Sequence, residues 1–187
     1  MASSRNKPVL IAWGIAVIVL AGFIWFNYSN GADGLDARDP EPSASVTNLV
    51  VTIGDRTFLM TNGVATAEPV AGSDTRETVR IIGEPALGDV NRDGHRDAAL
   101  LIANDPGGIG TFYYAVLAVN DAGSYHATNA LLVGDRAAPL TVDFLDGHFV
   151  YNYVDRRPGE PMTAGPSVRK SLWIRFDRAA GVISAGS

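Results

Sequence analysis

From residue 46 onward, short apolar runs alternate with turn sequences along the chain. The turns are marked by the dipeptides Gly54-Asp55, Asn62-Gly63 and Asp146-Gly147 and by the tetrapeptide at 120–123. Each turn lies between runs rich in β-branched or aromatic residues, an arrangement typical of antiparallel β-hairpins. No window in this part of the chain has a persuasive 3.6-residue apolar period over ten or more residues, so the pattern favours strands over helices.

The apolar runs predict nine strands. In several of them the side chains alternate between two faces, and at 149–154 both faces carry bulky residues. We therefore predict an all-β domain, built as an antiparallel meander that closes into a small barrel or sandwich. The predicted strands are residues 46–53, 56–60, 75–82, 98–103, 111–119, 124–133, 140–145, 148–154 and 168–176.

The N-terminal segment is different, because residues 9–26 contain no charged side chain. A helix of this length spans about 27 Å, close to the hydrocarbon thickness of a bilayer. Arg5 and Lys7 precede the run and no acid occurs before Asp33, so the positive-inside rule places residues 1–8 in the cytoplasm and the rest of the chain outside. We expect an uncleaved single-pass transmembrane anchor. A cleaved signal peptide is the alternative, although the run is longer than the usual apolar core of such a peptide.

Residues 27–45 are polar and rich in Gly, Pro, Asp and Ser. Such a composition cannot bury enough apolar surface to fold, so we interpret this segment as a flexible linker. It is followed by one expected extracytoplasmic domain at 46–178 and a C-terminal tail at 179–187. A domain of this length is sufficient for a single hydrophobic core.

Charge and cysteine content narrow the classes of function. All 20 acids and 13 of the 15 Lys and Arg residues lie beyond residue 26, so the external part has a formal charge of 13 minus 20, or −7. A basic nucleic-acid footprint is missing, and no nucleic-acid partner is expected. The chain has no cysteine, which excludes disulfides, thiolate metal sites and cysteine catalysis.

The strongest candidate site is the nonapeptide at 89–97, Asp-Val-Asn-Arg-Asp-Gly-His-Arg-Asp. Oxygen-bearing side chains stand at positions 1, 3, 5 and 9, and glycine stands at position 6. Ca²⁺ takes six to eight oxygen ligands, which a short loop supplies when alternate side chains point inward and glycine permits a sharp bend. The expected Ca²⁺ ligands are the side chains of Asp89, Asn91, Asp93 and Asp97 and the backbone carbonyl of His95.

An EF-hand is not expected, because position 12 is Leu100 instead of glutamate and a short apolar run typical of a strand follows the loop. The nonapeptide should therefore join two strands and bind Ca²⁺ weakly, with a Kd of roughly micromolar to millimolar. The alternative is a solvated turn in which the Asp and Asn side chains bond to nearby backbone amides and bind no metal.

A second candidate is the charged segment at 155–162, Asp-Arg-Arg-Pro-Gly-Glu-Pro-Met, which begins a long connection to Ser167. Connections of this length are uncommon unless they are functional or disordered. Arginines are suited to hold a carboxylate or phosphate group through paired hydrogen bonds. The alternative is a solvated loop with ion pairs of little energetic value. The candidate ligand-binding residues are Asp155, Arg156, Arg157 and Glu160.

Other chemistries find little support in the sequence. His95, His126 and His148 lack the spacing of a zinc site, and no serine lies in a G-x-S-x-G setting. No catalytic residue is assigned. Aromatic residues in the predicted strands, including Tyr151 and Trp173, are expected in the core instead of at a surface that stacks on sugar or peptide.

Four stretches carry a resemblance when taken together: Gly-Asp at 88–89 with the rest of the nonapeptide and Ala-Ala at 98–99, Gly-Thr-Phe-Tyr-Tyr at 110–114, Leu-Val-Gly-Asp-Arg at 132–136, and Arg-Pro-Gly-Glu-Pro-Met at 157–162. In this combination they resemble a family of exported or membrane-anchored bacterial proteins of unknown function, over about residues 58–176. The nonapeptide alone also resembles the calcium loops of FG-GAP and dockerin modules, here in a single copy. The resemblance implies an exported domain and implies no activity.

These observations predict a membrane-anchored, extracytoplasmic β domain that binds Ca²⁺. We expect it to act as a binding or envelope-associated module rather than as an enzyme, with an envelope protein or a glycan as its partner. The alternative is an envelope hydrolase, or a proteinaceous inhibitor of one, that uses the charged loop at 155–162.

Overall fold

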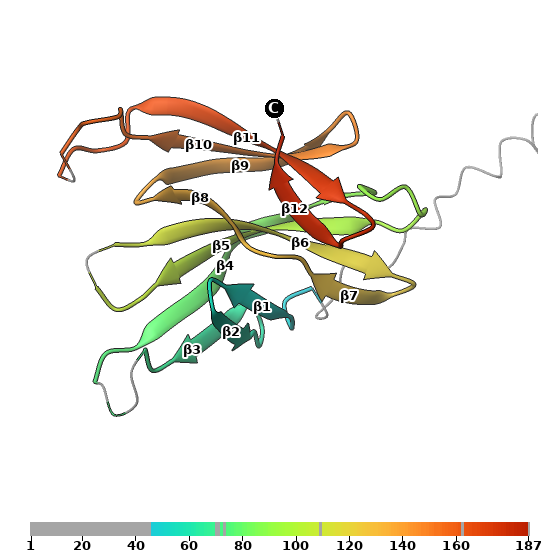
Figure 1. The fold of residues 1–187 in the computed structure, drawn as a ribbon, viewed down its shortest axis with the longest axis horizontal. Coiled ribbons are helices and arrows are strands. Elements are labelled where there is room, and N and C mark those ends of the chain that lie inside the picture. The colour runs from blue at the N-terminus through green and yellow to red at the C-terminus, as the bar shows by residue number, and fades with distance from the viewer. Residues whose placement is uncertain (1–45, 70–71, 73, 109, 162, 187) are drawn as a thin grey trace, which may run out of the picture. The chain divides into compact units, whose positions relative to one another are not determined.

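The computed structural model describes residues 46–186 except 70, 71, 73, 109 and 162. Every regular element in this part of the chain is a β-strand, and all the strand pairs are antiparallel (Figure 1). The prediction of an all-β domain of antiparallel strands is therefore confirmed. None of the described residues belongs to an apolar helix of membrane-spanning length. The expected cytoplasmic tail, anchor and linker at 1–8, 9–26 and 27–45 lie outside the described residues.

The strands form a hairpin and two larger sheets. A hairpin joins β1 to β2, and a central sheet has the order β3-β4-β5-β6-β7, with β8 also paired to β6. The C-terminal sheet has the order β12-β11-β10-β9. The strands are β1 (Val50–Ile53), β2 (Arg56–Leu59), β3 (Val64–Ala67), β4 (Glu77–Gly88), β5 (Asp97–Asp105), β6 (Phe112–Asp121), β7 (Ser124–Ala127), β8 (Leu131–Asp135), β9 (Ala138–Leu145), β10 (His148–Asp155), β11 (Val168–Asp177) and β12 (Val182–Ala185).

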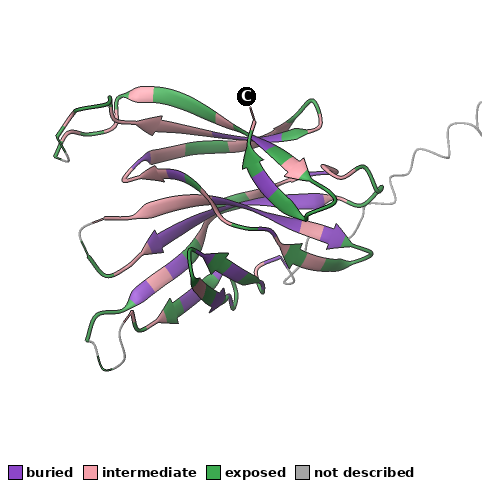
Figure 2. Ribbon diagram, viewed as in Figure 1, coloured by how far each residue is buried: buried purple, intermediate pink, exposed green. Residues whose placement is uncertain are grey.

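Strand β5 lies at the centre of the fold and is buried on both faces (Figure 2). Ala98, Leu100 and Ile102 pack in a cluster with apolar side chains of β1–β3 and the preceding residues. Ala99 and Leu101 point the other way, into a cluster with side chains of the C-terminal sheet. A strand covered on both sides needs a continuous apolar run instead of an alternating one, and residues 98–103 supply that run.

A bulge bends β4 and curls the central sheet into a half-barrel. The register between β4 and β5 shifts between Ile82 and Ala86, and Gly83 within the bulge has a φ of 69°. Beyond the bulge, β4 packs against β9, where Gly88 faces the ring of Phe144. A Cβ at Gly88 would collide with that ring, so glycine permits the close approach of the two strands. This contact fixes the position from which the nonapeptide starts.

The structure differs from the predicted strands in two respects. Residues 124–133 form two strands, β7 and β8, which both pair with β6. The regular pairing is interrupted at Thr128, where the side-chain hydroxyl accepts the hydrogen bond from Leu117 N, at 3.0 Å. Strands β3 and β12 were not predicted; β3 has the sequence Val-Ala-Thr-Ala, in which only Val64 is a large apolar residue. β12 lies in the expected tail at 179–187. It is held by the Asn129 side chain, whose Nδ2 donates to Ile183 O and whose Oδ1 accepts from Ile183 N.

Candidate metal loop and charged loop

The nonapeptide connects the end of β4 at Gly88 to the start of β5 at Asp97, so the expected strand-loop-strand arrangement is confirmed. We refer to residues 89–97 as the metal loop. Its chain reverses through two residues in the left-handed region, Arg92 with a φ of 59° and Gly94 with a φ of 91°. No heavy atom lies within 4 Å of a Cβ built on Gly94, so the backbone conformation, not the available space, favours glycine there.

Three side chains of the metal loop turn toward its own backbone. Asp89 accepts hydrogen bonds from Asp93 N at 3.1 Å and from Gly94 N at 3.0 Å. Asn91 Oδ1 accepts from Asp93 N at 3.0 Å, and its amide donates to Asp93 Oδ2 at 2.8 Å. His95 N donates to Asp93 Oδ1 at 2.8 Å, and this bond holds the pKa of Asp93 below its ordinary value of 3.8. Most of these oxygen contacts are with backbone amides of the same loop.

Asp97 ties the metal loop to the central sheet. Its side chain is fully buried, with Oδ2 accepting from Val90 N in the loop and Oδ1 accepting from Asn120 N on β6, each at 2.9 Å. Burial raises the pKa of Asp97 above 3.8, although both hydrogen bonds oppose that shift. One carboxylate therefore satisfies two backbone donors that belong to different parts of the chain.

The donor set of the metal loop is mixed. Within the described residues, no group of three or more His, Cys, Asp or Glu side chains is placed to hold a metal ion. Two carboxylates, Asp89 and Asp93, bond within the loop, whereas Asp97 is shared with β6. The other expected ligands are the side-chain oxygen of Asn91 and the backbone carbonyl of His95, which are neutral donors. Oxygen donors of this kind are suited to a hard cation such as Ca²⁺ and not to a soft metal.

A pocket of about 370 Å³ lies beside the metal loop. Asn91 and Asp93 line one side of it, while His126 on β7 and Arg178 after β11 line others. Sequence reasoning missed these neighbours, because His126 and Arg178 are distant along the chain and only the packing of the hairpins brings them together. The charge of Arg178 adds a smaller share to the lowered pKa of Asp93, after the hydrogen bond from His95 N.

The charged loop, which we define as residues 155–162, begins at the end of β10. Asp155 Oδ2 lies 2.8 Å from Lys170 Nζ on β11, and this partner holds the pKa of Asp155 below 3.8. Asp155 Oδ1 accepts from Arg156 N at 2.8 Å. The Arg156 guanidinium instead reaches the carbonyl of Asp135 at 3.3 Å. The acid at the start of the charged loop is therefore already paired with a cation.

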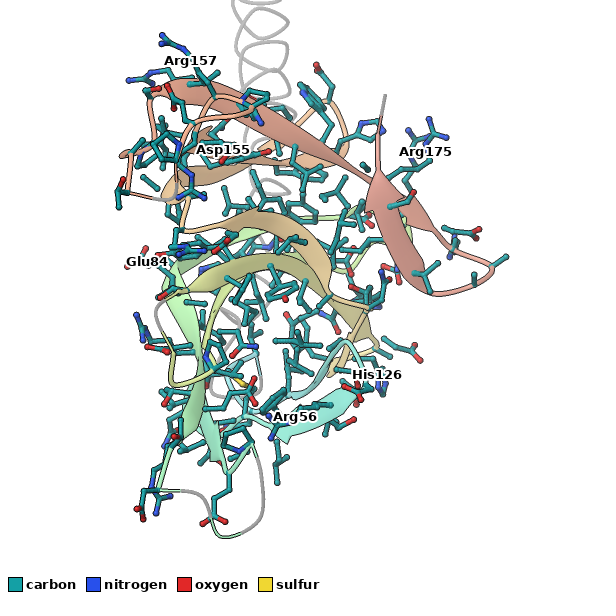
Figure 3. All side chains as sticks on the ribbon, turned by 60° about the vertical axis from the view of Figure 1, so that its left-hand side comes forward. Arg56, Glu84, His126, Asp155, Arg157 and Arg175 are labelled. Atoms are coloured by element: carbon teal, nitrogen blue, oxygen red, sulfur yellow. The ribbon has the colours of Figure 1, made fainter. Side chains whose placement is uncertain are left out.

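The other two candidate residues of the charged loop also pair with each other. Arg157 N donates to Glu160 Oε2 at 3.0 Å, and Arg157 Nη1 lies 3.8 Å from Glu160 Oε1. The Arg157 side chain is 69% exposed. Figure 3 shows Asp155 and Arg157 at the end of the C-terminal sheet that lies away from Arg175. Thus the four candidate ligand-binding residues come together, but Arg156 and Arg157 have different partners.

The aromatic side chains do not all lie in the core. Tyr151 is buried as expected, and its hydroxyl lies 3.1 Å from Leu100 O and 3.2 Å from Val116 O. Burial raises the pKa of Tyr151 far above its ordinary value. Trp173 was also expected in the core, and this expectation is wrong, because its side chain is 40% exposed on the outer side of the C-terminal sheet.

The candidate sites are defined by two loops at opposite ends of β10. The metal loop lies beside the β9–β10 hairpin, where Arg92 Nη2 is 4.0 Å from a Cβ built on Gly147. No family model, curated protein or solved structure matches this chain. Chemically, the metal loop offers side-chain oxygens held by backbone amides, and the charged loop offers the exposed guanidinium of Arg157 beside acids that already have cationic partners.

Proposed function

We propose that this protein is a membrane-anchored, extracytoplasmic β domain that binds Ca²⁺ and acts as a binding or envelope-associated module. The uncharged run at 9–26 serves as the single-pass anchor, with residues 1–8 in the cytoplasm and 27–45 as the linker. The charges of Arg5 and Lys7 before the run support this orientation. The resemblance to exported bacterial proteins supports the same placement. The apolar cluster shared by the central and C-terminal sheets supports a small sandwich as the finer architecture.

The observation that carries the calcium proposal is the folded metal loop itself. Asp89, Asn91 and Asp93 direct side-chain oxygens toward the backbone of one tight turn between two strands. A carboxylate has about four lone-pair sites, so an oxygen that accepts an N–H bond also retains capacity for a cation. The three Asp residues and Ca²⁺ leave a formal charge of about −1, which is consistent with weak, extracellular-type affinity.

The same loop suggests what calcium does for the domain. Asp97 joins the loop to β6, so ordering the loop also orders the adjoining end of β6 within the central sheet. A ligand that binds only the folded state stabilises it by RT ln(1 + [L]/Kd), about 1.4 kcal/mol at a tenfold excess over Kd. Calcium is therefore a structural ion in this proposal and not a catalytic one.

The test is the thermal unfolding of the full chain in detergent micelles, with calcium or with chelator. Millimolar Ca²⁺ should raise the Tm by about 4 °C, and Asp93→Ala should abolish the increment. The matched control is Asp105→Ala, since Asp105 also accepts a hydrogen bond within a turn, from Gly107 N, but lies outside the metal loop. This control should retain the increment. A melting curve that does not respond to millimolar Ca²⁺ rejects the proposal.

The alternative function, an envelope hydrolase or an inhibitor of one, has weaker support. A general acid needs a pKa raised toward neutrality. The pKa of Asp155 moves the other way, because Lys170 stabilises its charged form. The charged loop is therefore better suited to contact a partner than to transfer a proton.

A further inference from the structure

The outer side of the C-terminal sheet carries an organised row of polar and aromatic side chains. On β11, Leu172 and Ile174 pack into the core, so the side chains that alternate with them point outward. Asn152 on β10 lies opposite both Thr141 on β9 and Ser171 on β11 in the strand register. Exposed residues extend along β11 in Figure 2. We define the outer face by Asp143, Asn152, Arg169, Ser171, Trp173 and Arg175.

A hydrogen-bonded ladder crosses three strands of the outer face. Ser171 Oγ donates to Asn152 Oδ1 at 2.6 Å, and Asn152 Nδ2 donates to Thr141 Oγ1 at 3.0 Å and to Asp143 Oδ2 at 2.9 Å. Thr141 Oγ1 donates to the same carboxylate oxygen at 2.8 Å. Side chains that hold one another in this way are preorganised for a ligand. Among the described residues, no donor bonds to Asp143 Oδ1, which is left as an acceptor.

The outer face carries two hollows along β11 near Trp173. A groove of about 600 Å³ lies over Asn152, Arg169 and Ser171. A second hollow of about 310 Å³ is lined by Trp173, Arg175 and other residues near the β9–β10 hairpin. Trp173 lines the second hollow, follows the groove residue Ser171 two positions along β11, and remains 40% exposed. An exposed indole beside polar hollows offers an apolar platform with hydrogen-bonding groups near it.

Two cations stand at the ends of this row. In the part of the chain that the structure describes, no carboxylate lies within ion-pair distance of Arg169 or Arg175. The two arginines are six residues apart on one strand, which corresponds to about 20 Å. Arginine recognises carboxylates through paired hydrogen bonds. A ligand that reaches both cations must therefore be long and must carry more than one acidic group.

We propose that the outer face binds a polysaccharide of uronic acid units along β11. The apolar C–H side of one sugar ring stacks on Trp173, and its neighbours place hydroxyl groups on the ladder of Asp143 and Asn152. Ring carboxylates reach Arg169 at one end and Arg175 at the other. The proposal deepens the role of binding module, on which it rests, and names its ligand without using the metal loop.

The chemistry of the outer face favours this ligand over other polymers. A protein partner is expected to meet a central apolar patch, whereas the exposed apolar side chains that line the two hollows, Trp173 and Leu140, stand among charged and polar groups. A nucleic acid would require a basic domain, and the residues beyond position 26 carry a formal charge of −7 (13 minus 20). Arg169 and Arg175 are two isolated cations on an acidic protein, so they are suited to a polysaccharide whose carboxylates are spaced along an otherwise uncharged chain.

The experiment is isothermal titration of the full chain in detergent micelles with a galacturonic acid hexamer, its methyl ester and the monomer. Chelator is present throughout, so that calcium affects neither the sugar nor the metal loop. We expect the hexamer to bind, the uncharged ester to bind about tenfold more weakly, and the monomer to give no measurable heat. Failure of the hexamer to bind, or equal binding of the ester, overturns the proposal.

Variants locate the binding on the outer face. Trp173→Ala should weaken hexamer binding about tenfold, with partial recovery in Trp173→Phe. Arg169→Gln removes an exposed side chain, so it should keep the wild-type melting curve while reducing the preference for hexamer over ester. The matched control Arg80→Gln, which also replaces an exposed arginine but lies on β4 of the central sheet, should bind like the wild type. Unchanged hexamer affinity in both Trp173→Ala and Arg169→Gln overturns the proposal.

The result of the hexamer titration can be distinguished from the result of the calcium test. Loss of the calcium-dependent rise in Tm with intact hexamer binding rejects the metal loop as a calcium site and leaves the outer face standing. A normal calcium response without hexamer binding rejects only the outer face as a polysaccharide site.

Discussion

The metal loop and the charged loop both gather acids at a chain reversal, but they neutralise those acids in different ways. In the metal loop, the carboxylates of Asp89 and Asp97 accept hydrogen bonds from backbone amides. In the charged loop, Asp155 and Glu160 also accept from backbone amides, but each pairs in addition with a cation, Lys170 and Arg157 respectively. Amide donors occur in both loops, so the loops differ in whether a lysine or arginine also pairs with the acid and compensates its charge.

The difference has consequences for binding and for stability. A carboxylate held by amides keeps a full negative charge, which still attracts a metal ion, whereas a carboxylate held by lysine is already compensated. Amide donors are also fixed by the fold. Of the two that bond to Asp97, Asn120 N is buried and Val90 N is partly buried, so loss of their acceptor is costly. The exposed pairs of the charged loop are screened by water and contribute little.

The largest expected effect comes from removing the buried carboxylate. Asp97→Ala leaves Val90 N and Asn120 N without their acceptor, and each buried unsatisfied donor costs about 1–3 kcal/mol. We expect the free energy of unfolding in chelator to fall by about 3 kcal/mol. The matched variant in the charged loop, Asp155→Ala, should lower it by less than about 1 kcal/mol. Urea denaturation of both variants measures this contrast, and equal losses would contradict it.

Structural features that depend on residues close together in the chain could be predicted from the sequence. The spacing of Asp89, Asn91, Asp93 and Gly94 indicated a tight loop, since these side chains bond to amides only a few residues away. The run at 98–103 indicated a strand because it is apolar without a break. Strand β12 escaped prediction because Asn129, more than fifty residues earlier in the chain, holds it in place.

Contacts across the sheets could not be predicted in the same way. Lys170 meets Asp155 only because β10 and β11 pair in one register, and Arg178 reaches the pocket beside Asp93 only through packing of hairpins. Trp173 is a different case. It shares its face of β11 with Arg175 and alternates with the core residue Ile174, so strict alternation along β11 already indicated an exposed indole.

Two glycines with similar backbone conformations, one in each loop, allow the metal loop and the charged loop to be compared directly. The expected effect on stability is intermediate in size. Gly94 and Gly159 have φ values of 91° and 85°, and no heavy atom lies within 4 Å of a Cβ built on either. Alanine at each position should therefore cost about 1 kcal/mol through backbone strain alone. Only Gly94→Ala should also reduce the rise in Tm caused by calcium. Thermal unfolding in calcium and in chelator separates the two effects; an identical calcium response in both variants would show that the metal loop tolerates the strain.

The smallest expected effect lies at the exposed pair of the charged loop. Lys170 lowers the pKa of Asp155, so the pair contributes stability above the ordinary value of 3.8 and loses it as the pH falls through the lowered pKa. Lys170→Met should therefore reduce the free energy of unfolding by about 0.5 kcal/mol at neutral pH. The difference from the wild type should vanish as the pH falls below 3.8, because protonated Asp155 no longer attracts lysine. Urea denaturation at neutral and acidic pH measures it, with the calcium response as an internal control that the variant should retain. A deficit that grows on acidification would mean that Lys170 stabilises the fold through packing of its alkyl chain and not through its charge.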